Sequence, residues 1–326
     1  MEIIKITRRI DYVDIMKGFC ILFVLLCHTD PSIFWKSLYN PIFLTGFFFC
    51  SGYTFNLQKN FQSFFIRKFR TLVVPLFFLS LINGLAGTLI KGIPFKERLL
   101  GVLFEQVNGY DSLWFFSCLF STEMIFYFIL KYSKNKIILF FLSSIICAIG
   151  YTYIYMGWYN LPWQLELAAT CQIYLMLGVL FRVYEEKIDY KLFNRYFFLF
   201  ILIGYLFFCF ITYNKIDIHR EIFSNLALYL IENFFGLLLL VMICKLIKHN
   251  RILCYLGKHS LIIFAFNGFV LSMVSKVTNF LPIAIQDIKC WINVLIAASV
   301  LSLVSHIIYV YFPFIIGKSY KKNEKK

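Results

Sequence analysis

Long apolar stretches alternate with short polar segments along the chain of 326 residues. Ten of these stretches are long enough to cross a bilayer, which takes about 20 residues per helix. Their cores are residues 11–29, 41–58, 72–90, 113–131, 137–156, 165–182, 196–213, 223–244, 259–277 and 290–312. The pattern predicts an all-α, polytopic membrane protein with about ten transmembrane helices. We expect residues 1–326 to form a single membrane-embedded domain, with no appended soluble domain and no internal repeat.

Composition supports this prediction and indicates which kinds of partner the chain binds. The chain is 60% hydrophobic, 20% aromatic and only 15% charged, which is unusual for a soluble domain. Its net charge of +15 comes from basic residues in short clusters between apolar runs, as in membrane loops. We therefore expect a lipid bilayer as partner and no nucleic acid. The ten cysteines include no CxxC pair and no Cys/His cluster with zinc spacing, so we expect buried thiols and no metal.

The distribution of basic residues predicts the orientation. If the N-terminus is cytoplasmic, the inside segments hold 23 Lys and Arg residues and the outside loops hold 8. This excess favours both termini in the cytoplasm, because cytoplasmic loops are enriched in Lys and Arg. The tryptophans fall near the predicted outer helix ends, where interfacial aromatic residues are common. They are Trp35, Trp114, Trp158, Trp163 and Trp291.

The first predicted helix contains Asp14, Lys17 and His28, although ionisable groups are costly in a bilayer and often mark a functional site. Lys17 and His28 are 11 positions apart. On a helix they lie within about 20° of one another and about 16 Å apart along the axis. Asp14 is one turn before Lys17 on nearly the same face. Alternatively, Lys17 extends to the interface, or pairs with Asp14 only to order the helix, and His28 is a packed core residue.

Other charged residues are also candidates, each with a structural alternative. Arg67 and Arg70 suit phosphate recognition, or they anchor the helix end by the positive-inside rule. Glu123 lies half a span into residues 113–131, where Lys17 or a ligand is a possible partner, or it serves only the fold. We interpret Lys59 and Lys68 as topology signals. The other histidines are interpreted as solvent, interface or packing residues: His219, His249, His259 and His306.

Several motifs, in order along the chain, resemble the acyltransferase 3 family of integral-membrane acyltransferases. The first is Lys17-x10-His28, within DYVDIMKG, which resembles the basic-x10-His pattern of the family's first helix. FFFCSGYTF (47–55) resembles its FF-x-x-SG segment. Arg67-Lys68-Phe69-Arg70 resembles its R-x-x-R, and Pro75 follows in the next helix. Further similar segments are LWFFSCLFSTEMIFY (113–127), LPWQLELAATCQIYLMLGVLF (161–181) and GKHSLIIFAFNGFV (257–270).

The chain departs from the family pattern at two histidine positions. Asn267 stands where many members have histidine, and Asn40-Pro41 stands where many have His-x-Pro. These departures concern the identity of the acceptor more than the type of reaction.

The resemblance implies transfer of an acyl group, usually acetyl, from acyl-CoA to a hydroxyl of a cell-surface or lipid-linked glycan at the bacterial inner membrane. His28 would be the general base or accept the acyl group itself. Asp30 would orient it, or is simply an exposed helix-end residue. The predicted site residues are His28, Asp30 and Glu123 as catalytic groups, Lys17, Arg67 and Arg70 for acetyl-CoA, and Asp14, Ser51, Trp114, Glu166 and Asn267 for substrate.

A transporter or flippase for glycan or lipid is the alternative function. It would use the same charged helix faces as a translocation path. The lack of internal repeats, which many transporters have, favours the acyltransferase.

Overall fold

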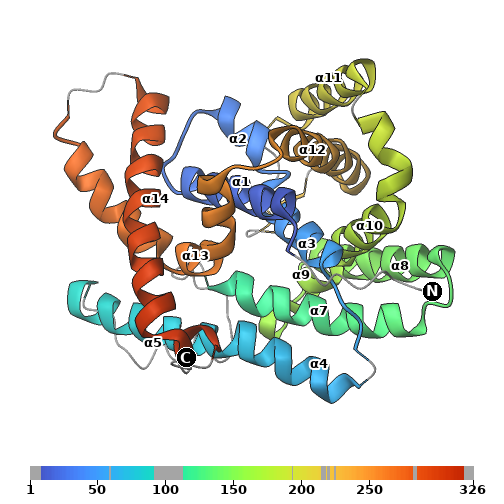
Figure 1. Cartoon of the computed structure of the whole chain (residues 1–326), viewed down its shortest axis with the longest axis horizontal. Coiled ribbons are helices and arrows are strands. Elements are labelled where there is room, and N and C mark those ends of the chain that lie inside the picture. Colours follow the sequence, from blue (N-terminus) through green and yellow to red (C-terminus); the bar gives the residue numbers. More distant parts are fainter. Residues whose placement is uncertain are drawn as a thin grey trace, which may run out of the picture.

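The computed structural model of the chain describes residues 9–58, 60–91, 113–192, 194–213, 218, 221–223, 225–281 and 285–318. This part of the chain is helical and contains no strand, which confirms the all-α prediction (Figure 1). In chain order the longer helices are α1 (Asp11–Cys27), α3 (Phe43–Tyr53), α5 (Val74–Lys91), α7 (Trp114–Tyr132), α8 (Lys136–Tyr155), α10 (Gln172–Leu192), α11 (Arg195–Thr212), α12 (Leu226–Ile247), α13 (Arg251–Thr278) and α14 (Gln286–Tyr311). The shorter elements are α2 (Ile33–Tyr39), α4 (Phe61–Lys68), η1 (Phe69–Val73), η2 (Pro162–Gln164), α9 (Leu165–Thr170) and η3 (Pro313–Ile316).

Several helices are long and apolar enough to cross a membrane, as expected for an integral membrane protein. Among the described residues there are six: α7, α8, α11, α12, α13 and α14. A seventh candidate joins Pro162–Thr170 to α10 across a bend of 52°. The other three predicted spans fall in α1, α3 and α5, of which α1 has 17 residues and α3 has 11. The total of ten spans therefore stays a prediction.

Three predicted spans differ in detail from the helices that form. The span 41–58 is helical only as far as Tyr53, and a loop leads from there to α4. The span 72–90 belongs to a longer helical run that begins at Phe61 and includes the π-helical turn η1. This turn ends two residues before Pro75, which has no backbone N–H to donate, and a π turn accommodates such a break. The span 165–182 is broken at Cys171.

Glycines allow two helix pairs at the centre of the molecule to approach closely. A Cβ atom on Gly18 of α1 would overlap the carbonyl oxygen of Leu253, and one on Gly257 of α13 would overlap that of Asp14. Gly52 of α3 and Gly178 of α10 face the partner backbone in the same way. Small residues let membrane helices pack backbone to backbone. The position of α1, which carries Lys17 and His28, is thus fixed by α13.

A partly buried polar cluster connects four of these helices. The carboxylate of Glu185 in α10 accepts a hydrogen bond from Tyr12 Oη of α1 at 2.9 Å and another from Tyr53 Oη of α3. The ammonium group of Lys245 in α12 lies 2.5 Å from the same carboxylate. Because the carboxylate receives both hydroxyl donors and a positive charge, its burial is compensated.

Asparagine side chains fix the starts of many helices. Each accepts a hydrogen bond from a backbone N–H of the first turn, which otherwise has no partner within the helix. The helices capped in this way are α4 by Asn60, α8 by Asn135, α11 by Asn194, α12 by Asn225 and α13 by Asn250.

Candidate active site

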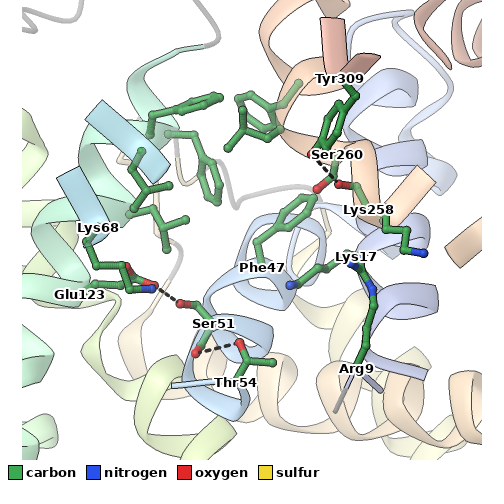
Figure 2. A pocket seen from close by; sticks show the side chains of 17 residues that line it. Arg9, Lys17, Phe47, Ser51, Thr54, Lys68, Glu123, Lys258, Ser260 and Tyr309 are labelled. Atoms are coloured by element: carbon green, nitrogen blue, oxygen red, sulfur yellow. Dashed lines mark hydrogen bonds and ion pairs between the residues drawn. The ribbon is translucent and has the colours of Figure 1, made fainter. Parts of the chain in front are cut away.

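A cavity of about 300 Å³ opens between α1, α3, α4, α7, α13 and α14 (Figure 2). Four basic residues line it: Arg9, Lys17, Lys68 and Lys258. Its apolar wall includes Phe47, Leu72, Phe115, Phe116, Leu119, Leu261 and Phe264. We call it the cationic pocket. A cavity with basic groups set in an apolar wall suits a ligand that has both anionic and apolar parts.

Glu123 is the acidic group of the cationic pocket. Its side chain is 2% exposed, and the Lys68 ammonium lies 2.6 Å from its Oε1. Ser51 donates its hydroxyl hydrogen to the same oxygen. Among the described residues Glu123 Oε2 has no hydrogen-bond partner, although it is buried. The partner of Glu123 is thus Lys68 and not Lys17. The interpretation of Lys68 as a topology signal does not account for this ion pair.

Lys17 lies across the cationic pocket from Lys68, near Arg9 (Figure 2). The carboxylate of Asp14, which is buried, is held by Arg9 through both oxygens, with a distance of 3.0 Å from Nη2 to Oδ1. Asp14 therefore pairs with Arg9 and not with Lys17. In the described part of the chain no ion pair of Lys17 is found, so its charge faces the cavity uncompensated.

The two arginines of the R-x-x-R segment do not line the cationic pocket. Arg67 donates to the carbonyl of Asn56 at 3.3 Å, and its guanidinium lies 5.7 Å from the centre of the Phe64 ring. Arg70 is exposed in η1. Lys68, one of the two residues between them, lines the cavity instead.

His28 lies at the other end of α1 from the cationic pocket. It is the C-terminal cap of the helix, and its side chain is exposed. The surrounding turn contacts the start of α14, where Cys290 Sγ donates to the carbonyl of Thr29 at 3.0 Å. The carboxylate of Asp30 lies 2.5 Å from the Lys36 ammonium and is 86% exposed. The structure thus places Asp30 with Lys36, in a turn where its φ is 54°.

The remaining predicted substrate residues lie outside the cationic pocket. Trp114 is the half-buried first residue of α7, and Asn267 is fully buried in α13. Glu166 is 2% exposed, and its Oε2 accepts from the backbone N–H of Leu161 at 3.1 Å. Glu221, in the segment before α12, lies beside Glu166. Burial and the neighbouring Glu166 carboxyl raise the pKa of Glu221 to about 7.

Besides Lys68, the cationic pocket contains other polar residues that were not among the predicted site residues, including Arg9, Lys258 and Tyr309. Arg9 and Lys258 had been counted only as inside charges, and Tyr309 had not been considered. The tyrosine hydroxyl donates to the carbonyl of Lys258 at 3.1 Å, which joins α14 to α13 beside the cavity. Lys258 belongs to the GKHS segment of the resemblance, so that motif was the available signal.

Comparison with known proteins identifies the family. The model of an acyltransferase domain, that of the acyltransferase 3 family, matches residues 10–312. The chain belongs to the acyltransferase 3 family. The sequence resemblance is therefore confirmed, and membership together with the apolar helices supports a membrane acyltransferase. No curated protein and no solved structure matches the chain significantly.

The geometry gives this acyltransferase two chemically different regions on one helix. The Lys17 end of α1 faces a cavity lined by basic and apolar groups. The His28 end carries an imidazole, which can exchange a proton near neutral pH. The two positions are about 16 Å apart along the helix axis.

Proposed function

We propose that the chain is a membrane O-acyltransferase that moves an acetyl or other short acyl group from acyl-CoA, with acetyl-CoA as the donor, to a hydroxyl of a cell-surface or lipid-linked glycan. The observation that carries the proposal is the cationic pocket on the helix that also bears His28. We place the protein in the bacterial inner membrane with ten spans and both termini in the cytoplasm, as the distribution of basic residues favours.

The donor's phosphates would bind in the cationic pocket. Arg9, Lys17 and Lys258 supply positive charge, and guanidinium and ammonium groups both bind phosphate. Lys68 is already paired with Glu123 and Arg9 with Asp14, so these two contribute less free charge than Lys17 and Lys258. The unpartnered Oε2 of Glu123 is an acceptor for an N–H group of the donor's arm. Arg67 and Arg70 would attract the donor from outside the cavity.

His28 would act at the far end of the donor. Acyl-CoA is a long molecule with phosphates at one end and the thioester at the other, which suits two regions about 16 Å apart on α1. His28 takes the proton of the acceptor hydroxyl as its oxygen attacks the thioester carbonyl, and CoA leaves as the thiolate. An acyl-histidine intermediate is the alternative route. The Asp30–Lys36 pair would hold the turn that presents His28.

The remaining site residues would support the donor pocket or serve the acceptor. Ser51 and Asp14 support the cationic pocket through Glu123 and Arg9. Trp114, Glu166 and Asn267 lie outside it, and we assign them to the acceptor path. The aromatic, acidic and amide side chains are groups that bind sugars by stacking and hydrogen bonding.

Mass spectrometry of surface glycan tests the function. Cells carrying the wild-type gene, a deletion, His28→Ala or His306→Ala are compared. Both variants are expressed at the protein level of the wild type. His306 is an exposed histidine of α14 and serves as the matched control. We expect the acetyl groups to disappear in the deletion and in His28→Ala and to persist in His306→Ala. Glycan of unchanged modification but reduced amount would instead indicate the transporter.

A further inference from the structure

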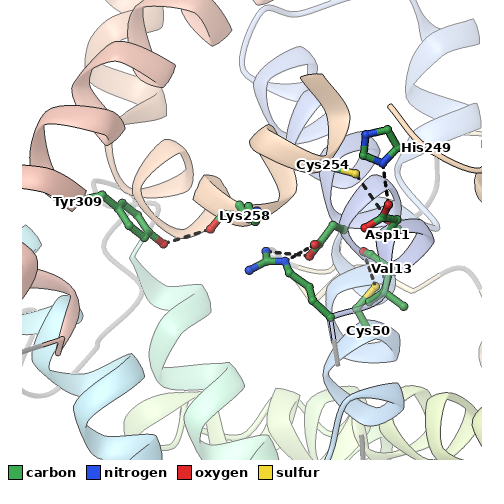
Figure 3. Close-up of polar contacts among 9 residues, drawn as sticks. Asp11, Val13, Cys50, His249, Cys254, Lys258 and Tyr309 are labelled. Carbon is green, nitrogen blue, oxygen red and sulfur yellow. Dashed lines mark hydrogen bonds and ion pairs between the residues drawn. The ribbon is translucent and has the colours of Figure 1, made fainter. Parts of the chain in front are cut away.

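Three side chains with different metal-binding atoms meet beside the start of α1, away from the predicted catalytic end of that helix (Figure 3). Asp11 is the first residue of α1, His249 immediately precedes the N-cap of α13, and Cys254 is in the first turn of α13. One ligand atom from each lies within 4.8 Å of the others. The set offers a carboxylate oxygen, an imidazole nitrogen and a sulfur.

Two contacts, one of them to the backbone of Asp11, show that the three residues converge. His249 Nδ1 lies 2.6 Å from Asp11 Oδ2, and Cys254 Sγ lies 3.8 Å from the carbonyl oxygen of Asp11. The Asp11 and His249 side chains are 51% and 58% exposed, whereas Cys254 is buried. Solvent therefore reaches the cluster from one side, while its sulfur is held on the protein side.

The backbone around the cluster is fixed by packing. Gly18 and Gly257 bring α1 and α13 into backbone contact, and Asn250 caps α13 between His249 and Cys254. The positions from which the three ligands extend are therefore set by the fold, and small rotations of exposed side chains suffice to surround an ion. A prearranged site loses less entropy on binding than a flexible one.

We propose that Asp11, His249 and Cys254 bind a divalent zinc-like cation, with water as the fourth ligand. Zinc favours a tetrahedral set of S, N and O ligands at about 2.0–2.3 Å, and three protein ligands with one open position is a common arrangement. The ion takes the place of the His249–Asp11 hydrogen bond, and the Cys254 thiol releases its proton to solvent when the Zn–S bond forms. The bound ion links the start of α1 to α13.

Spacing along the chain could not reveal this cluster. Asp11 and His249 are 238 positions apart, and His249 and Cys254 do not form a known zinc motif. The sequence prediction of no metal rested on such spacing, whereas the ligands meet only through the pairing of α1 with α13.

Cobalt and zinc binding to the purified full chain in detergent tests the proposal. After treatment with a chelator, Co²⁺ alone is added, and thiolate-to-cobalt absorption is recorded. We expect a band that saturates at one ion per chain and disappears when Zn²⁺ is added. Cys254→Ser should abolish the band, and His249→Ala and Asp11→Asn should weaken binding at least about tenfold, since even losing an outer-shell partner costs roughly 10–100-fold.

Two matched variants serve as controls. Cys147→Ser removes another buried thiol, and His306→Ala removes another exposed imidazole, and both should leave the cobalt band unchanged. Absence of the band from the wild-type protein would overturn the proposal, whatever the stability of the variants. An unchanged band in Cys254→Ser would overturn it as well. Neither result depends on transferase activity.

Discussion

At the scale of single residues, the Lys68–Glu123–Ser51 cluster places a paired carboxylate in the wall of the cationic pocket. Two hydrogen-bond donors, one of them charged, converge on a single oxygen of a carboxylate that is 2% exposed. Buried charges are tolerated when they are paired, and removing one partner leaves the other uncompensated. The cluster therefore joins α3, α4 and α7 only while all its members are present.

Glu123→Gln should lower the free energy of unfolding by about 1–3 kcal/mol, because the partly buried charge of Lys68 then lacks its carboxylate partner. The double variant Glu123→Gln/Lys68→Met should recover part of this loss, since it removes the unpaired charge as well. Thermal unfolding of the purified protein in one detergent measures both effects. Additive losses in the double variant would show that the two residues do not interact.

Glu221 predicts a pH dependence of stability. Its pKa is raised from 4.5 to about 7 by burial and by the Glu166 carboxyl, so the folded state binds this proton more tightly than the unfolded state. The contribution to stability is complete below about pH 4.5 and is lost as the pH rises through about 7. Glu221→Gln should remove this slope from the melting temperature, whereas the exposed Glu186→Gln should keep it. Equal slopes in all three proteins would contradict the assignment.

At the scale of elements, the close pairs α1–α13 and α3–α10 determine the geometry of the site. Gly52→Ala should destabilise the protein by about 1–3 kcal/mol, because the added methyl group would overlap the backbone of Leu175. Gly268→Ala is the matched control, since a Cβ there meets no atom within 4 Å. In a helix that change should be neutral or stabilising by up to about 1 kcal/mol. Similar melting temperatures for both variants would argue against the close packing of α3 and α10.

The sequence predicted the bounds of helices well where hydrophobic runs are long. It failed where tertiary contacts determine the point at which a helix ends. Residues 137–156 and 196–213 became α8 and α11 within one residue at each end, since each apolar run is long and its helix begins directly after an asparagine cap. The end of α3 at Tyr53 was not predicted, because the loop after it depends on distant partners. Arg182 and Tyr127, for example, donate to the carbonyls of Phe55 and Gln58 in this loop.

For the candidate site, the expected stripe on α1 stays a prediction, and the pairing between helices was not foreseen. Lys17 lines a cavity, whereas Asp14 and His28 do not. The partners of Glu123 and Asp14 were not foreseen, because Lys68 is 55 positions from Glu123 and Arg9 lies before α1 begins. Contacts of this kind depend on which helices pack together. The residue pattern of a single sequence does not reveal this pairing.

At the scale of the whole molecule, the apolar helices and the basic segments predict one orientation in the membrane. A green fluorescent protein fused to the C-terminus should fluoresce, and alkaline phosphatase fused there should be inactive, because both termini are expected in the cytoplasm. The same pair of reporters inserted near Trp158, in a predicted outer loop, should give the opposite result. Active phosphatase at the C-terminus would contradict the proposed topology and the side from which the donor binds.

The central claim is that a donor bound in the cationic pocket delivers its acyl group by way of His28. The most direct measurement is transfer of label from [¹⁴C]acetyl-CoA, added to inside-out membrane vesicles, into the glycan fraction. We predict incorporation with the wild-type protein and with His306→Ala, none with His28→Ala, and a strong reduction with Lys17→Gln. Equal incorporation by His28→Ala at the same protein level would contradict the claim, as would a wild-type protein that transfers no label.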